Sequence, residues 1–310
     1  MRMSMTKWEL TPISEPLDVG TRIHWDEETQ RAIFVDVPNG TVYSYYNNTG
    51  EIVKAKVADE PIAFMFPVEG SDTKFIAGLS KKLVFVEWDG KSPQVSKVEK
   101  IVEVEKEKEF KGNRFNGAKV DPWGRLWAGT MGPTAEDGTT ENHKGALYSL
   151  TKDTLKKHES NIGISNGLAW DTKTNKMYYI DTLVPCVFQY DISKDGTLSN
   201  KTKVFDFKKQ NISGLPDGLT IDSNGNLWVC AIHGSHLVKF NPNDGKVIEK
   251  IQFPTPQVTA VTYGGKNLDK LFVTTARIAV NGQVPPPPAG TTYVVYNAKV
   301  PGYAGDRYKP

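Results

Sequence analysis

Short apolar stretches alternate with polar turns along almost the whole chain. Residues 41–45 (TVYSY) and 178–181 (YYID) are rich in aromatic and β-branched side chains and are spaced as in a strand. A period of two predicts β-strands that bury one face, and the 3.6-residue period of an amphipathic helix is scarce here. The pattern therefore predicts an all-β protein.

A repeat of about fifty residues organises these strands. Five segments share a short apolar strand, a turn rich in Asp, Asn and Gly, and a second strand with aromatic residues; they begin at Ile23, Ala118, Leu168, Leu219 and Ala260. Residues 63–88 supply a sixth unit between the first two. Units of about four strands each favour a six-bladed β-propeller, because a sandwich or paired barrels would not need this period. We predict a single domain over residues 1–310, with blades in about 15–305 and residues 1–14 as an N-terminal extension or closing strand.

Polar residues from distant repeats are expected to meet at the central channel, because the loops that enter the innermost strands of a propeller converge there. Asn166-Gly167 and Asp217-Gly218 occupy the same position in neighbouring units. Their amide and carboxylate oxygens are hard ligands suited to Ca²⁺ or Mg²⁺. The alternative is that both dipeptides are simply turns, for which they are favoured.

Residues 163–167 (GISNG) match the G-x-S-x-G pattern of serine hydrolases. That nucleophile elbow needs a strand followed by a helix, with a histidine and an acid further along the chain. A second strand is expected after this segment, so we interpret Ser165 as a bystander. Its neighbour Asn166 is the residue of interest.

The composition adds few constraints on function. Lys and Arg total 38 against 36 Asp and Glu, so the net charge of +2 indicates neither a nucleic-acid nor a membrane partner. The run Glu103–Glu109 alternates in sign and is interpreted as a solvated strand or loop edge. Cys186 and Cys230 are expected to be buried free thiols. The sequence has no stretch typical of a signal peptide or a membrane span, so we expect a cytoplasmic location.

Several longer segments carry a family resemblance, namely RFNGAKVDPWGRLWAGTM, GALYSL, ISNGLAWD, KMYYIDT, PDGLTIDSNGNLWV, VTYGGKNLDKLFVTTA and PGYAG. Over nearly its whole length the chain resembles the senescence-marker-protein-30/regucalcin/gluconolactonase family, which includes the insect luciferin-regenerating enzymes. The resemblance implies a six-bladed propeller with one divalent cation (Ca²⁺, Mg²⁺, Mn²⁺ or Zn²⁺) near the channel. It also implies a small-molecule substrate and no organic cofactor.

The resemblance also assigns site residues. The family holds its cation with a Glu of the first blade, the Asn of an S-N-G-L segment and the Asp of a P-D-G segment; the last two correspond to Asn166 and Asp217. An Arg and an Asn of an R-x-N-D-G-K segment hold the substrate and correspond to Arg114 and Asn116. Asp217 is also the expected catalytic base. In this mechanism the cation polarises a lactone carbonyl and acidifies a water, whose proton the carboxylate accepts.

This chain departs from the family at three acidic positions. The E-G-P-H-W motif reads TRIHW, so the Glu ligand is replaced by Thr21, whose hydroxyl is a weak ligand at best. Gly117 replaces the Asp of the R-x-N-D-G-K segment, and residues 132–134 lack an acidic residue that some members carry there. Because Ca²⁺ affinity depends on ligand charge and number, we expect metal binding that is weak or lost.

Two further expectations follow from the lost charges. If Arg22 turns inward, its guanidinium would occupy the cation's place and pair with Asp217. A site with fewer charges also suits a substrate less polar than a sugar lactone, which Phe64 and Phe115 would contact. His24 keeps the family's His-Trp pair and is interpreted as a substrate-binding or supporting residue.

Three functions remain open at this point. The first is a lactonase-type hydrolase acting on ester or lactone bonds. The second is a non-catalytic small-molecule binding protein, and the third is a cyclase or isomerase on the same scaffold, since one fold hosts many chemistries. In each case we expect a monomer or weak dimer whose partner is a small molecule.

Overall fold

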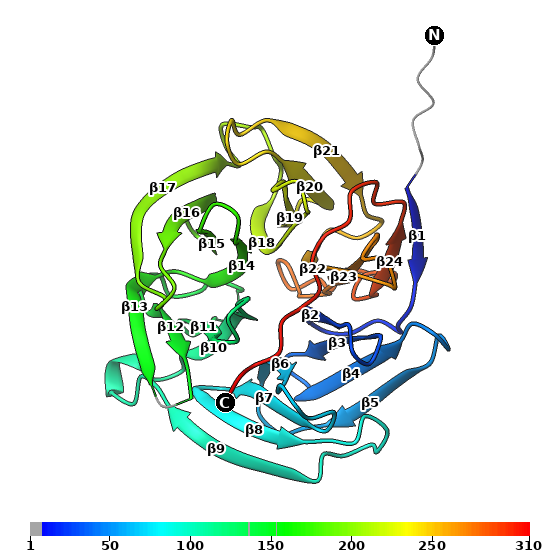
Figure 1. Ribbon diagram of the computed structural model, residues 1–310, viewed down its shortest axis with the longest axis vertical. Coiled ribbons are helices and arrows are strands. Elements are labelled where there is room, and N and C mark those ends of the chain that lie inside the picture. The colour runs from blue at the N-terminus through cyan, green and yellow to red at the C-terminus, as the bar shows by residue number, and fades with distance from the viewer. Residues whose placement is uncertain (1–7, 136, 153) are drawn as a thin grey trace.

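Six four-stranded antiparallel sheets are arranged in a ring around a central channel (Figure 1). The computed structural model describes residues 8–135, 137–152 and 154–310. The arrangement confirms the predicted six-bladed β-propeller. In five blades the strands follow in chain order from the channel outward, and in the sixth the order is β22-β23-β24-β1. Strand β1 therefore joins the N-terminal segment to the last blade.

The strands fall into four concentric layers. The innermost are β2 (Gly20–Asp26), β6 (Ile62–Pro67), β10 (Arg114–Val120), β14 (Ser165–Asp171), β18 (Leu215–Ile221) and β22 (Val258–Gly264). The second are β3 (Arg31–Asp36), β7 (Lys74–Leu79), β11 (Leu126–Met131), β15 (Lys176–Asp181), β19 (Leu227–Ile232) and β23 (Lys270–Thr275). The third are β4 (Thr41–Tyr46), β8 (Lys82–Glu87), β12 (Gly145–Leu150), β16 (Cys186–Ile192), β20 (His236–Phe240) and β24 (Tyr293–Tyr296). The outermost are β5 (Ile52–Lys56), β9 (Lys97–Glu103), β13 (Leu155–Ile162), β17 (Leu198–Asp206), β21 (Val247–Gln252) and β1 (Glu9–Pro12), and a short 3-10 helix, η1 (Lys108–Phe110), precedes β10.

The aspartates that recur along the sequence form the turns between the first two strands of a blade. Asp121, Asp171 and Asp222 each accept the backbone N–H two residues further on, at 2.9–3.0 Å. Such Asx turns end a strand because the side chain replaces the ladder partner of the backbone. The repeat visible in the sequence is thus a repeat of these turns.

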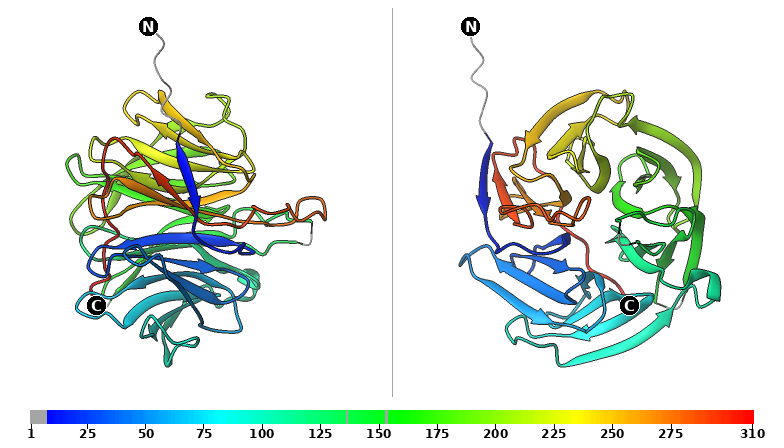
Figure 2. Two further views of the ribbon diagram at one scale, coloured as in Figure 1. Left: turned by 90° about the vertical axis from the view of Figure 1, so that its right-hand side faces the viewer. Right: turned by 180° about the vertical axis from the view of Figure 1, so that it is seen from behind.

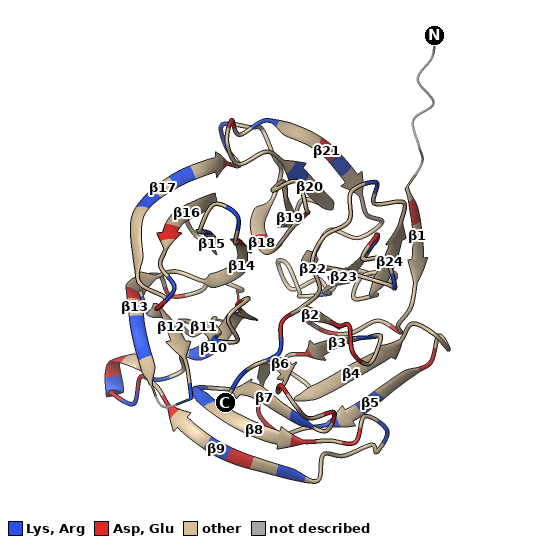
Figure 3. Ribbon diagram, viewed as in Figure 1, with Lys and Arg blue, Asp and Glu red and all other residues tan. Residues whose placement is uncertain are grey.

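The core lies between neighbouring blades, where the inner and second strands are almost completely buried. Both cysteines are buried free thiols, as expected from the sequence. Lysines and acidic residues gather on the outer strands and loops, with both signs interspersed (Figure 3). The inner strands therefore contribute few charges, and those few lie at the channel.

One loop projects from one face of the ring (Figure 2). It connects β23 to β24 through residues 276–292 and contains the Pro285–Pro288 run. Gln257, just before β22, holds the base of this loop through two hydrogen bonds with the backbone of Ile278, at 2.6 and 2.8 Å. This face is therefore the one where the innermost strands begin.

The C-terminal residues 297–310 cross the opposite face of the ring and pass over the channel (Figures 1 and 2). We call this segment the strap. Its backbone bonds to several blades, since the N–H groups of Gly302, Gly305 and Lys309 donate to Leu268, Trp25 and Gly124 at 2.9–3.0 Å. The strap consequently covers the end of the channel where the innermost strands finish.

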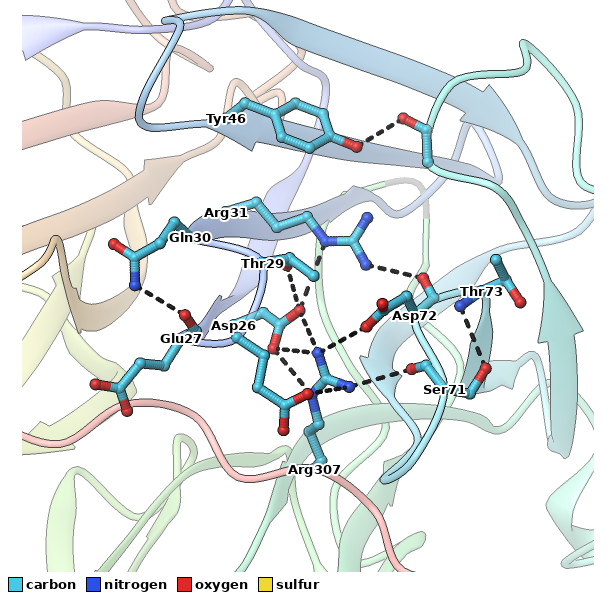
Figure 4. Close-up of polar contacts among 12 residues, drawn as sticks. Asp26, Glu27, Thr29, Gln30, Arg31, Tyr46, Ser71, Asp72, Thr73 and Arg307 are labelled. Carbon is cyan, nitrogen blue, oxygen red and sulfur yellow. Dashed lines mark hydrogen bonds and ion pairs between the residues drawn. The ribbon is translucent and has the colours of Figure 1, made fainter.

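A buried ion pair fastens the strap to the first blade (Figure 4). Arg307 donates two hydrogen bonds to the carboxylate of Asp26, at 2.9 and 3.0 Å, and a third to the carbonyl of Ser71. Asp26 is 1% exposed and also lies 3.6 Å from Nε of Arg31. The strap is thus anchored by a bidentate contact that water does not screen.

In the part of the chain that the structure describes, no helix is long and apolar enough to cross a bilayer.

Candidate functional site

The candidate side chains come from irregularities in four inner strands. In β2, β10, β14 and β18 the pairing with the next strand slips by one residue near the start of the strand. The first residue inside each slip is, in turn, Arg22, Asn116, Asn166 and Asp217. An extra residue of this kind redirects a side chain out of the regular alternation. Residues far apart in sequence therefore meet at the channel through one repeated local feature.

Asn166-Gly167 and Asp217-Gly218 are not turns, because each dipeptide lies within an innermost strand. Their glycines allow neighbouring blades to approach. A Cβ on Gly167 would lie 2.6 Å from the carbonyl oxygen of Asp217, and one on Gly218 would lie 2.5 Å from Cα of Ala260. Likewise, a Cβ on Gly117 would lie 2.3 Å from the carbonyl oxygen of Asn166. The turn interpretation is thus wrong, and these glycines close the ring around the site.

A substitution tests this close packing. Gly167→Ala is expected to lower the free energy of unfolding by about 1–3 kcal/mol, the usual cost of inserting atoms into a packed interior. Urea unfolding followed by tryptophan fluorescence measures this change. An unchanged midpoint would contradict the contact with the Asp217 backbone.

Asn166 and Asp217 lie side by side, and each has a buried oxygen that accepts no hydrogen bond from the described residues. Asn166 donates through Nδ2 to the hydroxyl of Thr182 at 2.9 Å, and Thr182 donates to the carbonyl of Pro216 at 2.8 Å. This chain of hydrogen bonds fixes the orientation of the amide. Among the described residues, Oδ1 of Asn166 and Oδ1 of Asp217 accept no hydrogen bond. Two such acceptors indicate a place for a donor from a ligand or a water.

The side chain of Arg22 enters the same site. It is 6% exposed, its Nε donates to the carbonyl of Asn116 at 3.0 Å, and its Nη1 lies 3.7 Å from Oδ1 of Asp217. The backbone of Arg22 has φ of 52°, a conformation that favours glycine, and the family motif has glycine at this position. The neighbouring Thr21 pairs regularly with Val35. The guanidinium has therefore turned inward toward Asp217.

Burial is the largest cause of the pKa shifts of Asp217, Arg22 and Arg114. It raises the pKa of Asp217 to about 6, against the opposing effects of Arg22 and of the Asn166 hydrogen bond. Burial lowers the pKa of Arg22, which the charge of Asp217 opposes. Burial also lowers the pKa of Arg114 to about 10, and the nearby Arg22 lowers it further. At neutral pH the site thus holds two guanidinium cations and one carboxylate.

Arg114 and Asn116 lie at this site, but the protein itself engages part of their polar groups. Nη1 of Arg114 donates to the carbonyl of Phe115 at 3.0 Å and to Oδ1 of Asn116 at 3.2 Å. Nδ2 of Asn116 donates to the carbonyl of Ser165 at 3.0 Å. The protein thus engages one of the three guanidinium nitrogens of Arg114 and both polar atoms of the Asn116 amide.

The aromatic residues expected to line the site lie in the core instead. Phe64 and Phe115 are both 0% exposed, with ring centroids 6.1 Å apart, and they belong to the hydrophobic cluster between the second and third blades. The structure therefore places them behind the channel wall. Their contact with a substrate stays a prediction.

His24 lies deeper in the channel than Arg22. It is 3% exposed, its ring packs 5.4 Å from that of Phe66, and a Cβ on Gly305 of the strap would lie 2.3 Å from it. Burial lowers the pKa of His24 to about 4, so the ring is neutral at physiological pH. Its position between the site and the strap fits a supporting residue better than a contact to substrate, which stays a prediction.

The oxygen ligands at the site are too few and too weakly charged for the divalent cation that the resemblance implies. Ca²⁺ takes six to eight oxygen ligands and gains affinity from carboxylate charge. Here one carboxylate is present, that of Asp217, and the Arg22 guanidinium faces it. Within the described ranges, no group of three or more His, Cys, Asp or Glu side chains is placed to hold a metal ion. These residues do not fit a resident cation.

Glu105 was missed by the sequence reasoning, which assigned the run Glu103–Glu109 to solvent. It is 7% exposed and accepts hydrogen bonds from Asn113, Thr130 and Tyr148 at 2.7, 2.7 and 3.1 Å. Three neutral donors can hold a buried carboxylate. Glu105 thereby fixes Asn113, the residue before Arg114. The alternating charges hid this role, because no local pattern distinguishes Glu105 from its exposed neighbours.

Comparison with known proteins agrees with this geometry. Residues 19–277 match the family model described as SMP-30/Gluconolactonase/LRE-like region. Regucalcin of Pongo abelii is 33% identical over 311 residues, which cover 99% of each chain. Regucalcin of Homo sapiens is 32% identical over 289 residues, 92% of each chain.

Solved structures support the same assignment. A luciferin-regenerating enzyme is 36% identical, with a TM-score of 0.90 over 98% of this chain and 100% of the other. A regucalcin of Agrobacterium tumefaciens, described as a calcium-binding protein, has a TM-score of 0.84 over 98% of each chain. At 20% identity the latter supports the fold alone. The protein belongs to the SMP-30/gluconolactonase/LRE-like family.

Proposed function

We propose that the protein is a small-molecule hydrolase of the lactonase type that works without a tightly bound metal ion. One observation carries the proposal: Nη1 of Arg22 lies 3.7 Å from Oδ1 of Asp217, within the group of residues that would otherwise bind a cation. Membership of a family that includes gluconolactonases supports a lactonase-type function at the level of the family. The guanidinium then supplies the positive charge that a metal supplies elsewhere.

The residues have separate roles in this reaction. The guanidinium of Arg22, assisted by Arg114, donates hydrogen bonds to the carbonyl oxygen of the ester and stabilises the negative charge that develops there. Asp217 accepts a proton from a water, whose oxygen attacks the carbonyl carbon. The ring carbon–oxygen bond then breaks, and the alkoxide takes the proton back from Asp217. The product is a hydroxy acid, and the carboxylate is restored.

The same contacts support a substrate that is less polar than a sugar lactone. Arg114 and Asn116 already bond to each other and to backbone carbonyls, so part of their hydrogen-bonding capacity is used within the protein. A buried polar group that is satisfied internally gains little from a further hydroxyl. We therefore propose an ester or lactone with a mainly apolar body. The small-molecule partner, the monomeric or weakly dimeric state and the cytoplasmic location remain predictions.

A non-catalytic binding protein is the second candidate. The carboxylate of Asp217 faces the guanidinium of Arg22, and this pairing opposes the rise of its pKa on burial. A base held in an ion pair is a weaker base. This candidate predicts ligand binding without turnover, so a hydrolysis assay with and without a chelator distinguishes the two.

The pH dependence of hydrolysis is the first test. Because Asp217 acts in its ionised form and burial raises its pKa to about 6, kcat/KM is expected to rise with pH up to about 6 and to level off above it. Hydrolysis of an aliphatic lactone, measured from pH 4.5 to 8 with excess chelator, gives the profile. Asp217→Asn is expected to remove at least about 99% of the activity. A chelator that abolishes wild-type activity, or a profile that is flat between pH 5 and 7, contradicts the proposed role of Asp217 and Arg22.

A further inference from the structure

A second pocket lies at the opposite end of the channel from Asp217. It has a volume of about 300 Å³ and is lined by Lys119 from the third blade, Trp170 from the fourth, Leu268 from the sixth, and Tyr303 and Asp306 from the strap. Four residues of extended strand, roughly 13 Å, separate Trp170 from Asn166 at the other site. The volume is near the lower end of the range for small-molecule pockets. The strap and the inner strands thus form a separate concave site.

The charged and N–H groups that line this pocket are incompletely paired within the described residues. The ammonium of Lys119 donates one long hydrogen bond, 3.5 Å, to the carbonyl of Leu219. The half-buried Asp306 interacts with Lys119 through its charge, without a direct hydrogen bond or ion pair among the described residues. In the same part of the chain the indole N–H of Trp170 has no acceptor, although Trp170 is only 5% exposed and a buried N–H is normally satisfied. One cation, one anion and one neutral donor therefore remain available to a ligand.

The remaining walls are mainly apolar or aromatic, with Thr172 and Thr220 as polar members. Ile221 and Leu268 line the pocket, and Tyr303 lies beside them on the strap with 44% of its surface exposed. Glu27 adds a second carboxylate at the rim. Burial lowers the pKa of Lys119 to about 8 and raises that of Asp306 to about 6, as expected for two charges that are not in direct contact.

We propose that this pocket binds a small zwitterion with an apolar body, an α-amino acid with an aromatic or aliphatic side chain. Lys119 and the Trp170 N–H hold the carboxylate, and Asp306, with Glu27 at the rim, holds the ammonium. Tyr303, Leu268 and Ile221 contact the side chain. An anion alone would leave Asp306 unpaired, and a cation alone would leave Lys119 unpaired. The inference is independent of the proposed hydrolase activity, because none of these residues takes part in the proposed reaction.

Isothermal titration calorimetry of the full-length protein tests the proposal with three matched probes. Phenylalanine carries both charges, 3-phenylpropionate lacks the ammonium, and phenethylamine lacks the carboxylate. Charge-assisted hydrogen bonds of this kind change affinity by about tenfold or more, so phenylalanine is expected to bind at least about tenfold more tightly than either analogue. Equal affinity for the three probes, or no binding of phenylalanine, leucine and tryptophan, overturns the proposal.

Two variants test which residue binds each charged group of the ligand. Lys119→Met is expected to weaken phenylalanine binding by about tenfold while leaving phenethylamine binding unchanged, and Asp306→Asn is expected to do the same for phenylalanine while sparing 3-phenylpropionate. Lys173→Met is the matched control, because Lys173 lies on the same face outside this pocket and bonds to Ser223. Thermal unfolding establishes that each variant is folded. If both variants bind phenylalanine as tightly as the control does, the assignment of Lys119 and Asp306 is wrong.

Discussion

The double variant Thr21→Glu/Arg22→Gly is expected to bind divalent cations more tightly than the wild-type protein does. Removing the guanidinium leaves Oδ1 of Asp217 and Oδ1 of Asn166 without a facing cation, and the new glutamate adds a second carboxylate beside them. Glycine also suits the backbone at position 22, where φ is 52°. In thermal unfolding with Ca²⁺ or Mn²⁺ at a hundredfold excess over Kd, binding contributes about 2.7 kcal/mol. The midpoint of unfolding is therefore expected to rise by several degrees and to return with EDTA.

One single variant and one triple variant test separately whether the new glutamate and Asp217 are needed to bind the metal. Thr21→Glu alone is expected to gain little, because the new carboxylate would pair with the Arg22 guanidinium rather than with a metal. Adding Asp217→Asn to the double variant is expected to abolish the metal-dependent shift. If the wild-type protein and the double variant bind Ca²⁺ equally well by calorimetry, Arg22 does not replace a cation.

Arg307→Met is expected to cost about 3 kcal/mol or more in the free energy of unfolding. The substitution keeps the apolar stem but leaves Asp26, which is 1% exposed, with the more distant Arg31 as its neighbouring cation. Removing one partner of a buried ion pair typically costs about 3–5 kcal/mol. Arg31, 3.6 Å from Asp26, places the expected loss at the lower end of this range. Urea unfolding measures this loss, and the strap is expected to become sensitive to limited proteolysis.

Arg277→Met is the matched control for this prediction. Arg277 also contacts a carboxylate through two nitrogens, at 2.6 and 2.9 Å from Asp18, but both side chains are about 40% exposed. Exposed pairs contribute at most about 1 kcal/mol because water screens them. Asp26→Asn/Arg307→Met is expected to recover part of the stability lost in Arg307→Met. Equal losses in the two arginine variants would mean that the strap is not anchored by Asp26.

Local sequence patterns were sufficient to predict the strands and turns of the propeller. Recurring aspartates such as Asp121 and Asp171 end innermost strands, since a carboxylate two residues before an amide favours a turn wherever it occurs. The alternation of apolar and polar residues also predicted the strands from local sequence, because it depends only on which face of a strand is buried. A resemblance in several segments then brought Asn166 and Asp217 together, as the structure also does.

Contacts between residues of different blades could not be predicted from these local sequence patterns. Glu105 reads as one member of a solvated run, yet three donors from separate segments bury it. The Asn166-Gly167 dipeptide reads as a turn, yet its glycine permits the approach of the next blade at Asp217. In both cases the deciding partner lies elsewhere in the sequence, and residue type alone does not identify it.

The six-bladed ring, the family and the loss of carboxylates at the candidate cation site follow from the sequence alone. Tertiary structure decided what replaced them, because the inward turn of Arg22 depends on a slipped register in β2 and on Asn116 and Asp217 from other blades. It also decided that the strap closes the channel and forms a pocket with Lys119 and Trp170. Strands and turns follow from interactions between near neighbours in the chain, whereas the charge balance of a channel follows from side chains that meet only when the ring closes.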